Sequence, residues 1–197
     1  VLQRAAEIWA AVLDSPVPIR VRVRMGALSC SDASLTLGTG GPTTLAWNFA
    51  NAPRRDTAYP IALANALART DLAPGDDMEL NFNLLFDQGC SGSFAGWWYG
   101  LDPDQPGPGD RFPMLSVALH EFGHGLGFLA SVDPASGAWI ASRPSLWGDF
   151  LFDQQQGRHW RAMSNGQRAQ SARNDPFLVW TGRYVNQQLP AFLRGTA

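Results

Sequence analysis

The segment "ALHEFGHGLGF", residues 118–128, decides how the rest of the chain is interpreted. Two histidines, His120 and His124, stand four residues apart, and Glu121 directly follows the first. An α-helix brings side chains four residues apart onto one face, so the two imidazoles can face the same metal ion. The apolar residues before them favour a helix, and the glycines that follow are suited to end it. The segment therefore predicts a helix that carries a metal site.

The residue types in this segment point to zinc and to hydrolysis. Zinc prefers nitrogen and sulfur ligands, and a catalytic zinc keeps one position open for water. His120 and His124 are the predicted ligands, whereas Glu121 is the predicted general base, which takes a proton from the zinc-bound water. Zinc lowers the pKa of that water from 15.7 to about 7, which suits amide hydrolysis at neutral pH. The alternative is that both histidines are ordinary polar residues of a helix without metal.

A third zinc ligand has to come from elsewhere, and we expect it after the histidine helix. The segment "RPSLWGDFLFD", residues 143–153, supplies the first candidate. Its proline is expected to open a helix, on which Asp149 and Asp153 share a face. Asp149 is then predicted to bind the metal, and Asp153 to accept a hydrogen bond from a ligand histidine, which fixes the tautomer of that histidine. An exposed acidic helix face is the alternative.

Two other residues are candidates for the third ligand. His159 is the only other histidine of the chain, but its glutamine- and glycine-rich neighbours predict an exposed position. Asp133 precedes the proline and glycine of a predicted turn, so a structural role for its carboxylate competes with metal binding.

A calcium site is a weaker hypothesis. Asp102, Asp104 and Asp110 lie close together in a loop rich in glycine and tryptophan. Their carboxylates are of the type that calcium prefers, but they lack the regular spacing of a dedicated calcium loop. We therefore interpret them as an exposed acidic turn.

Hydrophobic periodicity elsewhere predicts an α+β fold. Residues 1–128 are expected to form an N-terminal α+β part that ends in the zinc helix, and residues 129–197 a mainly helical C-terminal part that carries the third ligand. Both belong to one catalytic unit with the cleft between them. The strand "MELNFN", residues 78–83, is expected at a sheet edge, where an extended peptide can pair with it. The other expected elements are a helix over 2–12, a strand over 19–25, short strands within 35–49 and a helix over 61–68.

Composition and charge exclude several classes of function. A chain of 197 residues, 45% of them hydrophobic, is long enough to bury a core, and we expect a monomer. The net charge of −2 gives no electrostatic basis for binding nucleic acid. No apolar run approaches the roughly 20 residues that span a bilayer. The chain starts at Val1 without a signal peptide, which is expected of a processed or excised fragment. Cys30 and Cys90 are predicted to form one disulfide in a secreted protein, or two buried thiols in a cytosolic one.

Beyond the zinc helix, the chain resembles the zincins, and among them secreted bacterial metallopeptidases with an "HExGHGLGF" helix. The likeness extends over most of the chain, through "NFANAP", "TAYPIALANALA", "NFN", "WWYGLD" and "LVWTG". It implies a zincin-like fold, zinc, secretion and endopeptidase activity on protein or peptide substrates. By this likeness His120 and His124 match the ligands and Glu121 matches the base. Such proteins often carry a neighbouring protease-associated domain.

The chain departs from the stricter metzincin pattern at the third ligand. In that pattern the ligand falls six residues after the second histidine, where this chain has Ala130, which cannot bind a metal. The pair Asp149 and Asp153 is instead similar to the ExxxD helix of thermolysin-like enzymes. Met163 matches a methionine turn beneath the zinc, as in metzincins. The alternative for Met163 is a plain core methionine before a helix that begins with a capping box.

Together these features predict a secreted, zinc-dependent α+β endopeptidase with one zinc ion. Secretion in turn favours the disulfide between Cys30 and Cys90. Two rival functions are kept. One is a zincin-like binding or adhesion module whose zinc is structural or lost, and the other is a zinc amidase that acts on non-peptide amides.

Overall fold

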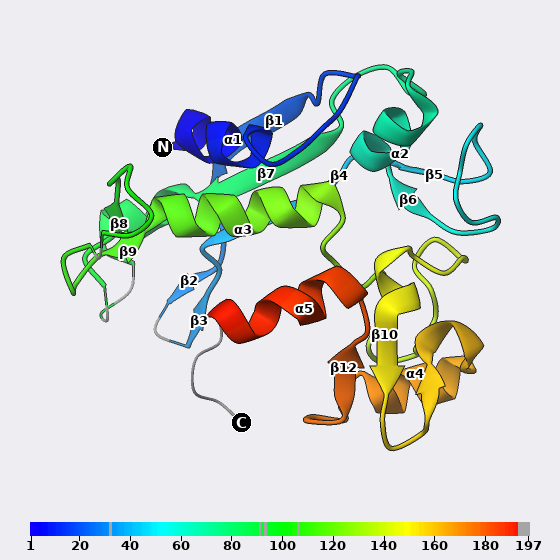
Figure 1. Ribbon diagram of the computed structural model, residues 1–197. Coiled ribbons are helices and arrows are strands. Elements are labelled where there is room, and N and C mark those ends of the chain that lie inside the picture. Colours follow the sequence, from blue (N-terminus) through cyan, green and yellow to red (C-terminus); the bar gives the residue numbers. More distant parts are fainter. Residues whose placement is uncertain (32, 91, 93, 106, 193–197) are drawn as a thin grey trace. The chain divides into compact units, whose positions relative to one another are not determined.

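The computed structural model describes residues 1–31, 33–90, 92, 94–105 and 107–192, which form a mixed α+β structure (Figure 1). The chain divides into two units. The N-terminal unit contains Val1–Pro53 and Tyr59–Phe128, and the C-terminal unit contains Arg54–Ala58 and Leu129–Ala197. No helix in the described part of the chain is both long and apolar enough to cross a membrane.

The main sheet of the N-terminal unit has the strand order β1-β7-β4. Strand β7 (Met78–Asn83) pairs in parallel with β1 (Val21–Gly26) and antiparallel with β4 (Gly38–Pro42). The alternation in "MELNFN" buries Met78, Leu80 and Phe82 completely. Because β7 pairs on both sides, the prediction that it lies at a sheet edge is wrong. The edge strands of this sheet are β1 and β4.

Three helices belong to the same unit, namely α1 (Leu2–Ala10), α2 (Ile61–Ala68) and α3 (Met114–Leu126). The predicted helices over 2–12, over 61–68 and around the histidine motif are therefore confirmed. Helix α3 packs against α1, β4 and β7 (Figure 1). Buried apolar side chains fill the space between these elements: Ala5, Met78, Leu80, Phe82, Leu115, Ala118 and Phe122.

Short elements complete the N-terminal unit. The pairs are β2 (Cys30–Ser31) with β3 (Ser34–Leu35), β5 (Leu45–Ala46) with β6 (Tyr59–Pro60), and β8 (Trp97–Trp98) with β9 (Phe112–Pro113). A 3-10 helix, η1 (Leu84–Gln88), follows β7. The predicted disulfide between Cys30 and Cys90 is present and links β2 to the residues after η1.

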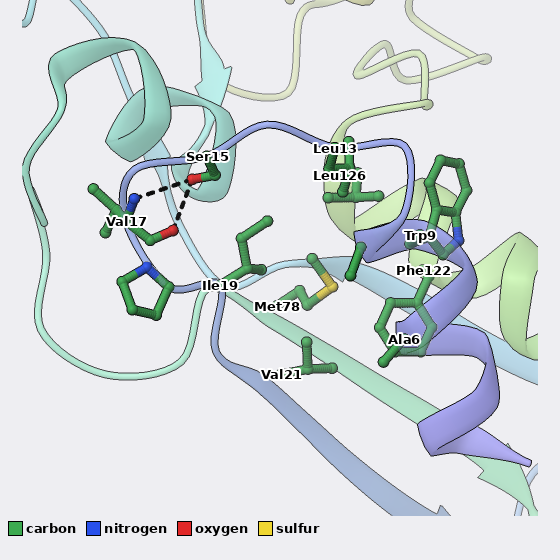
Figure 2. Close-up of a pocket in the computed structure, with 12 residues that line it drawn as sticks. Ala6, Trp9, Leu13, Ser15, Val17, Ile19, Val21, Met78, Phe122 and Leu126 are labelled. Atoms are coloured by element: carbon green, nitrogen blue, oxygen red, sulfur yellow. Dashed lines mark hydrogen bonds between the residues drawn. The ribbon is translucent and has the colours of Figure 1, made fainter.

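An apolar pocket of about 300 Å³ is lined by α1, the segment that follows α1, α3 and the strands β1 and β7 (Figure 2). Trp9 lines it and donates a hydrogen bond from Nε1 to the Leu119 carbonyl oxygen, 3.1 Å away, which ties α1 to α3. The polar side chain of the lining, Ser15, donates its hydroxyl hydrogen to the Val17 carbonyl oxygen at 2.7 Å. The pocket therefore presents an almost entirely apolar surface.

The C-terminal unit contains a three-stranded antiparallel sheet and two helices. Strand β10 (Leu151–Asp153) lies between β11 (Arg158–His159) and β12 (Leu178–Trp180). The helices are α4 (Asn165–Ser171), which begins with the predicted capping box, and α5 (Arg183–Phe192). Short 3-10 helices cover Trp147–Phe150 (η2) and Trp160–Ala162 (η3). Helical residues outnumber strand residues in this part, as predicted, but the three-stranded sheet was not predicted.

The largest error concerns the segment that carries Asp149 and Asp153. The predicted helix after Pro144 is absent; Asp149 lies in η2, and Asp153 ends β10. The two carboxylates therefore do not share a helix face. The physical reason is that Leu151 and its neighbours find strand partners far along the chain, for example Leu151 opposite Trp180 in β12. Aromatic and branched residues favour such pairing, and tertiary contacts override a proline that only permits a helix start.

Candidate metal centre

Helix α3 positions the histidine pair. It ends at Gly127, whose backbone has a φ of 109°, a left-handed conformation that glycine adopts without strain. The Nε2 atoms of His120 and His124 lie 2.9 Å apart, and the two rings meet edge to face. Helical spacing thus brings both imidazoles to one point in space, as the sequence predicts.

The tautomer of His124 follows from its second nitrogen. Its Nδ1 lies 2.9 Å from the carbonyl oxygen of Phe128, which can only accept a hydrogen bond. Nδ1 must therefore carry the hydrogen, and Nε2 offers a lone pair toward His120. His120 can donate a hydrogen bond from its Nε2 to this lone pair, or, with its Nε2 unprotonated, share a metal ion with His124. Metal-binding histidines commonly donate their other ring N–H to a carbonyl or carboxylate in this way, so the pair fits zinc.

Glu121 lies buried between α3 and the glycine-rich strand β4. Glu121 is only 6% exposed to solvent. A Cβ atom placed on Gly40 would lie 2.4 Å from the Glu121 carbonyl oxygen, and one placed on Gly38 would lie 3.1 Å from the Glu121 Cγ. Glycine at both positions therefore lets the strand approach the helix closely. Burial raises the pKa of the Glu121 carboxyl above its ordinary value, and His120 and His124 partly offset this rise.

A groove of about 490 Å³ runs between β4 and the exposed side of α3. The groove brings Gly38, at the start of the edge strand β4, next to His120 and Glu121. Lining residues come from the segment that leads into β4 (Leu35, Thr36, Leu37, Gly38) and from around α3 (Phe112, Ser116, Val117, His120, Glu121). The sequence did not single out these glycines, although the run "LGTGGP" carries the signal that backbone approaches backbone closely there.

Asp149 is engaged by two arginines of the C-terminal unit. Its side chain is completely buried and lies 2.8 Å from Nη1 of Arg54 and 3.1 Å from Nη1 of Arg161. A metal ion would have to displace both guanidinium groups from the carboxylate oxygens, so these ion pairs oppose metal binding by Asp149. Neither arginine was predicted as a partner; Arg54 lies 95 residues from Asp149 in the sequence, and Arg161 lies 12.

Asp153 is likewise bound within the C-terminal unit. It accepts hydrogen bonds from Asn174 Nδ2 at 3.0 Å and from the Gln156 backbone N–H at 2.8 Å. Burial raises the pKa of Asp153, but these hydrogen bonds outweigh burial and hold the pKa below its ordinary value. The structure thus gives Asp153 a role in holding the loop after β10, and its predicted contact with a ligand histidine stays a prediction.

The other candidate ligands differ in how strongly they are held. Asp133 accepts hydrogen bonds from the Ser136 backbone N–H at 2.7 Å and the Ala135 backbone N–H at 3.2 Å, so the competing turn role is confirmed. His159 is exposed, as predicted, and its ring lies 5.0 Å from that of Phe152. Within the described residues, no hydrogen bond involves the His159 ring.

Met163 and the calcium candidates show local roles. Met163 is buried in a small core with Val132 and Trp160, as the alternative to a methionine turn expects. Asp102 accepts a hydrogen bond from the Asp104 backbone N–H at 3.0 Å, as in an ordinary acidic turn. Among the residues that the structure describes, no group of three His, Cys, Asp or Glu side chains is placed to hold a metal ion. The candidate site therefore consists of two histidine ligands, beside which the described residues place no third.

Comparisons with models of protein families, with curated proteins and with solved structures found no match.

Proposed function

We propose that the protein is a zinc-dependent endopeptidase. The observation that carries this proposal is the placement of two imidazole Nε2 atoms 2.9 Å apart beside a buried glutamate on the same helix. Paired imidazoles suit zinc, and a carboxyl group with a raised pKa suits proton transfer near neutral pH. The Cys30–Cys90 disulfide supports a protein made for an oxidising compartment, in agreement with secretion.

The roles of the residues follow from their positions. His120 and His124 would hold the zinc, which supplies an activated water and a Lewis acid for the scissile carbonyl. The Glu121 carboxylate accepts the proton of the attacking water and passes it to the leaving amine. Its burial beside Gly38 limits the positions that the carboxylate can take, which keeps it directed for proton transfer.

Strand β4 is the proposed binding edge for a peptide substrate. It lies at the edge of the main sheet, and the groove that contains His120 and Glu121 adjoins it. An extended peptide can add to such an edge through main-chain hydrogen bonds, which bind many different sequences. This assigns to β4 the role that the sequence predicted for β7.

The third ligand is a separate question, for which substitutions of three residues are decisive. Asp149 stays the prediction from sequence, although its two ion pairs oppose it. His159 offers an imidazole without a competing hydrogen bond in the described part of the chain, so it deserves the first test. Zinc content of the His159→Ala and Asp149→Asn proteins separates the two, with Asp133→Ala as the control whose carboxylate already serves a turn.

A comparison of Glu121→Gln with the parent protein tests the function. A broad peptide library, digested by zinc-loaded protein, should show internal cleavage by the parent protein. The variant should keep its zinc and lose about 10²–10⁴-fold of the rate, the usual range for losing general acid–base catalysis. Zinc binding without any cleavage by the parent protein would favour the binding or adhesion module. Cleavage of small amides but not of peptides would favour the amidase.

A further inference from the structure

The C-terminal unit contains a cavity of about 610 Å³ whose chemistry differs from that of the metal centre. The side chains that give it its character are Arg54, Arg161, Phe150 and the buried Asp149. This cavity is formed by residues of one unit only. His159 and Asp149, two candidates for the third zinc ligand, also line this cavity, so the inference below rests on its two arginines.

Positive charge exceeds negative charge at this cavity. Arg54 and Arg161 bring two guanidinium groups, whereas Asp149 brings one carboxylate, which both of them contact. The Asp149 side chain is fully buried, but those of Arg54 and Arg161 are 47% and 39% exposed. The carboxylate is thus the buried member of this cluster, and the two guanidinium side chains are its partly exposed members.

The same contacts hold the two guanidinium groups in place. Arg161 also donates a hydrogen bond from Nη1 to Thr57 Oγ1 at 2.9 Å, and the Arg54 guanidinium lies 5.8 Å from the centre of the Phe150 ring. Side chains that are already ordered lose little conformational entropy when a ligand binds. A planar guanidinium matches a carboxylate, because two parallel N–H groups can meet its two oxygens.

The net charge of the whole C-terminal unit also favours an anionic ligand. Arg54–Ala58 and Leu129–Ala197 together contain nine arginines and five aspartates, with neither lysine nor glutamate, for a net charge of +4. The remainder of the chain has a net charge of −6. The overall value of −2 therefore hides a cationic C-terminal unit, which attracts anionic ligands over a distance set by the ionic strength.

We propose that this cavity binds the carboxylate of an acidic peptide, with Arg54 and Arg161 as the contacting groups and Asp149 as the anchor that orients them. The carboxylate has two sources, an aspartate or glutamate side chain and the carboxyl end of a peptide. If the proposed endopeptidase function is correct, the cavity adds a preference for acidic substrates. The binding proposal itself does not depend on zinc or on hydrolysis.

Calorimetric titration of the full chain, in the Glu121→Gln form so that peptides are not cleaved, tests the proposal. The probes are three acetylated pentapeptides: Ala-Ala-Glu-Ala-Ala amide, Ala-Ala-Gln-Ala-Ala amide, and the glutamine peptide with a free carboxyl end. At least one carboxylate peptide should bind about tenfold or more tightly than the neutral one. This preference should weaken as sodium chloride is raised. Which carboxylate peptide is preferred identifies the source.

Arg54→Gln is the diagnostic substitution, because Asp149 keeps its ion pair with Arg161. It should abolish the preference for carboxylate peptides. Arg54→Lys keeps the positive charge but lacks the planar guanidinium with its parallel N–H groups, so it should reduce this preference. Arg55→Gln is the matched control, since it removes the same charge from the next, exposed residue and should keep the preference. Equal affinity for all three peptides, or an unchanged preference in Arg54→Gln, would overturn the proposal. Displacement of bound peptide by inorganic phosphate, but not by acetate, would overturn it in favour of a phosphate site.

Discussion

The substitution Gly40→Ala tests the close packing of β4 against α3. The new Cβ atom would lie 2.4 Å from the Glu121 carbonyl oxygen and 2.9 Å from its carbonyl carbon. An ordinary contact needs about 3.4 Å or more, so strand and helix would have to separate by about 1 Å. Both obstacles are backbone atoms, which cannot swing aside. Overpacking of this kind typically costs about 1–3 kcal/mol of unfolding free energy, and we expect about 2 kcal/mol here.

Two other glycines of the same strand complete the test, Gly41 as the matched control and Gly38 as a probe of the Glu121 side chain. A Cβ on Gly41 meets no atom within 4 Å, so Gly41→Ala should cause no clash. The variant should be as stable as the parent protein or more stable by about 0.4–1 kcal/mol, because alanine lowers the conformational entropy of the unfolded chain. A Cβ on Gly38 would meet the side chain of Glu121, with Oε1 at 3.2 Å. Gly38→Ala should therefore shift the Glu121 carboxylate by a few tenths of an ångström, with a smaller loss of stability. If Glu121 is the general base, as proposed, the turnover number should fall about tenfold.

Urea denaturation in the presence of a chelator measures these effects without a contribution from zinc binding. With a slope of about 2 kcal/mol per molar urea, Gly40→Ala should lower the midpoint by about 1 M relative to the parent protein. Gly41→Ala should leave the midpoint unchanged or raise it. If Gly40→Ala proves as stable as Gly41→Ala, β4 does not pack against α3 as described, and the position assigned to Glu121 is wrong.

Two further predictions concern stability. Replacing both Cys30 and Cys90 by serine removes a disulfide between residues 60 positions apart in the sequence. The chain-entropy model predicts that the unfolding free energy falls by about 4 kcal/mol. Unchanged thermal stability would contradict this. Burial raises the pKa of Glu121 in the folded state above its value in the unfolded chain. The protonated carboxyl therefore favours folding fully at a pH below the unfolded pKa, and this stability is lost as pH rises through the folded pKa, because ionising the buried carboxyl costs free energy. Metal-free Glu121→Gln should therefore be more stable than the parent protein at pH 7 but not near pH 4, and equal melting temperatures at pH 7 would argue against a buried carboxylate.

Local features of the fold could be predicted from the sequence, because neighbours along the chain determine them. The spacing of His120 and His124 fixes their common helix face, and the alternation in residues 78–83 fixes which side chains of β7 are buried. The Cys30–Cys90 pairing was also predicted, because two cysteines allow a single disulfide.

Features that depend on distant partners were missed. The central position of β7 follows from pairing with both β1 and β4, and periodicity within one strand carries no signal of its neighbours. Asp149 was assigned to a helix because the pairing of Leu151 with Trp180 is not visible locally. For the same reason Arg54 was not recognised as its partner. A buried carboxylate can bind metal or guanidinium, and only the fold distinguishes these roles.

Zinc stoichiometry is the most direct test of the central claim, that His120 and His124 hold a catalytic zinc ion. Elemental analysis of protein purified without added metal should find close to one zinc per chain. The variants His120→Ala and His124→Ala should each lose it, whereas Glu121→Gln should retain it. Full zinc content in His124→Ala, or no zinc in the parent protein even after incubation with zinc salts, would contradict the account.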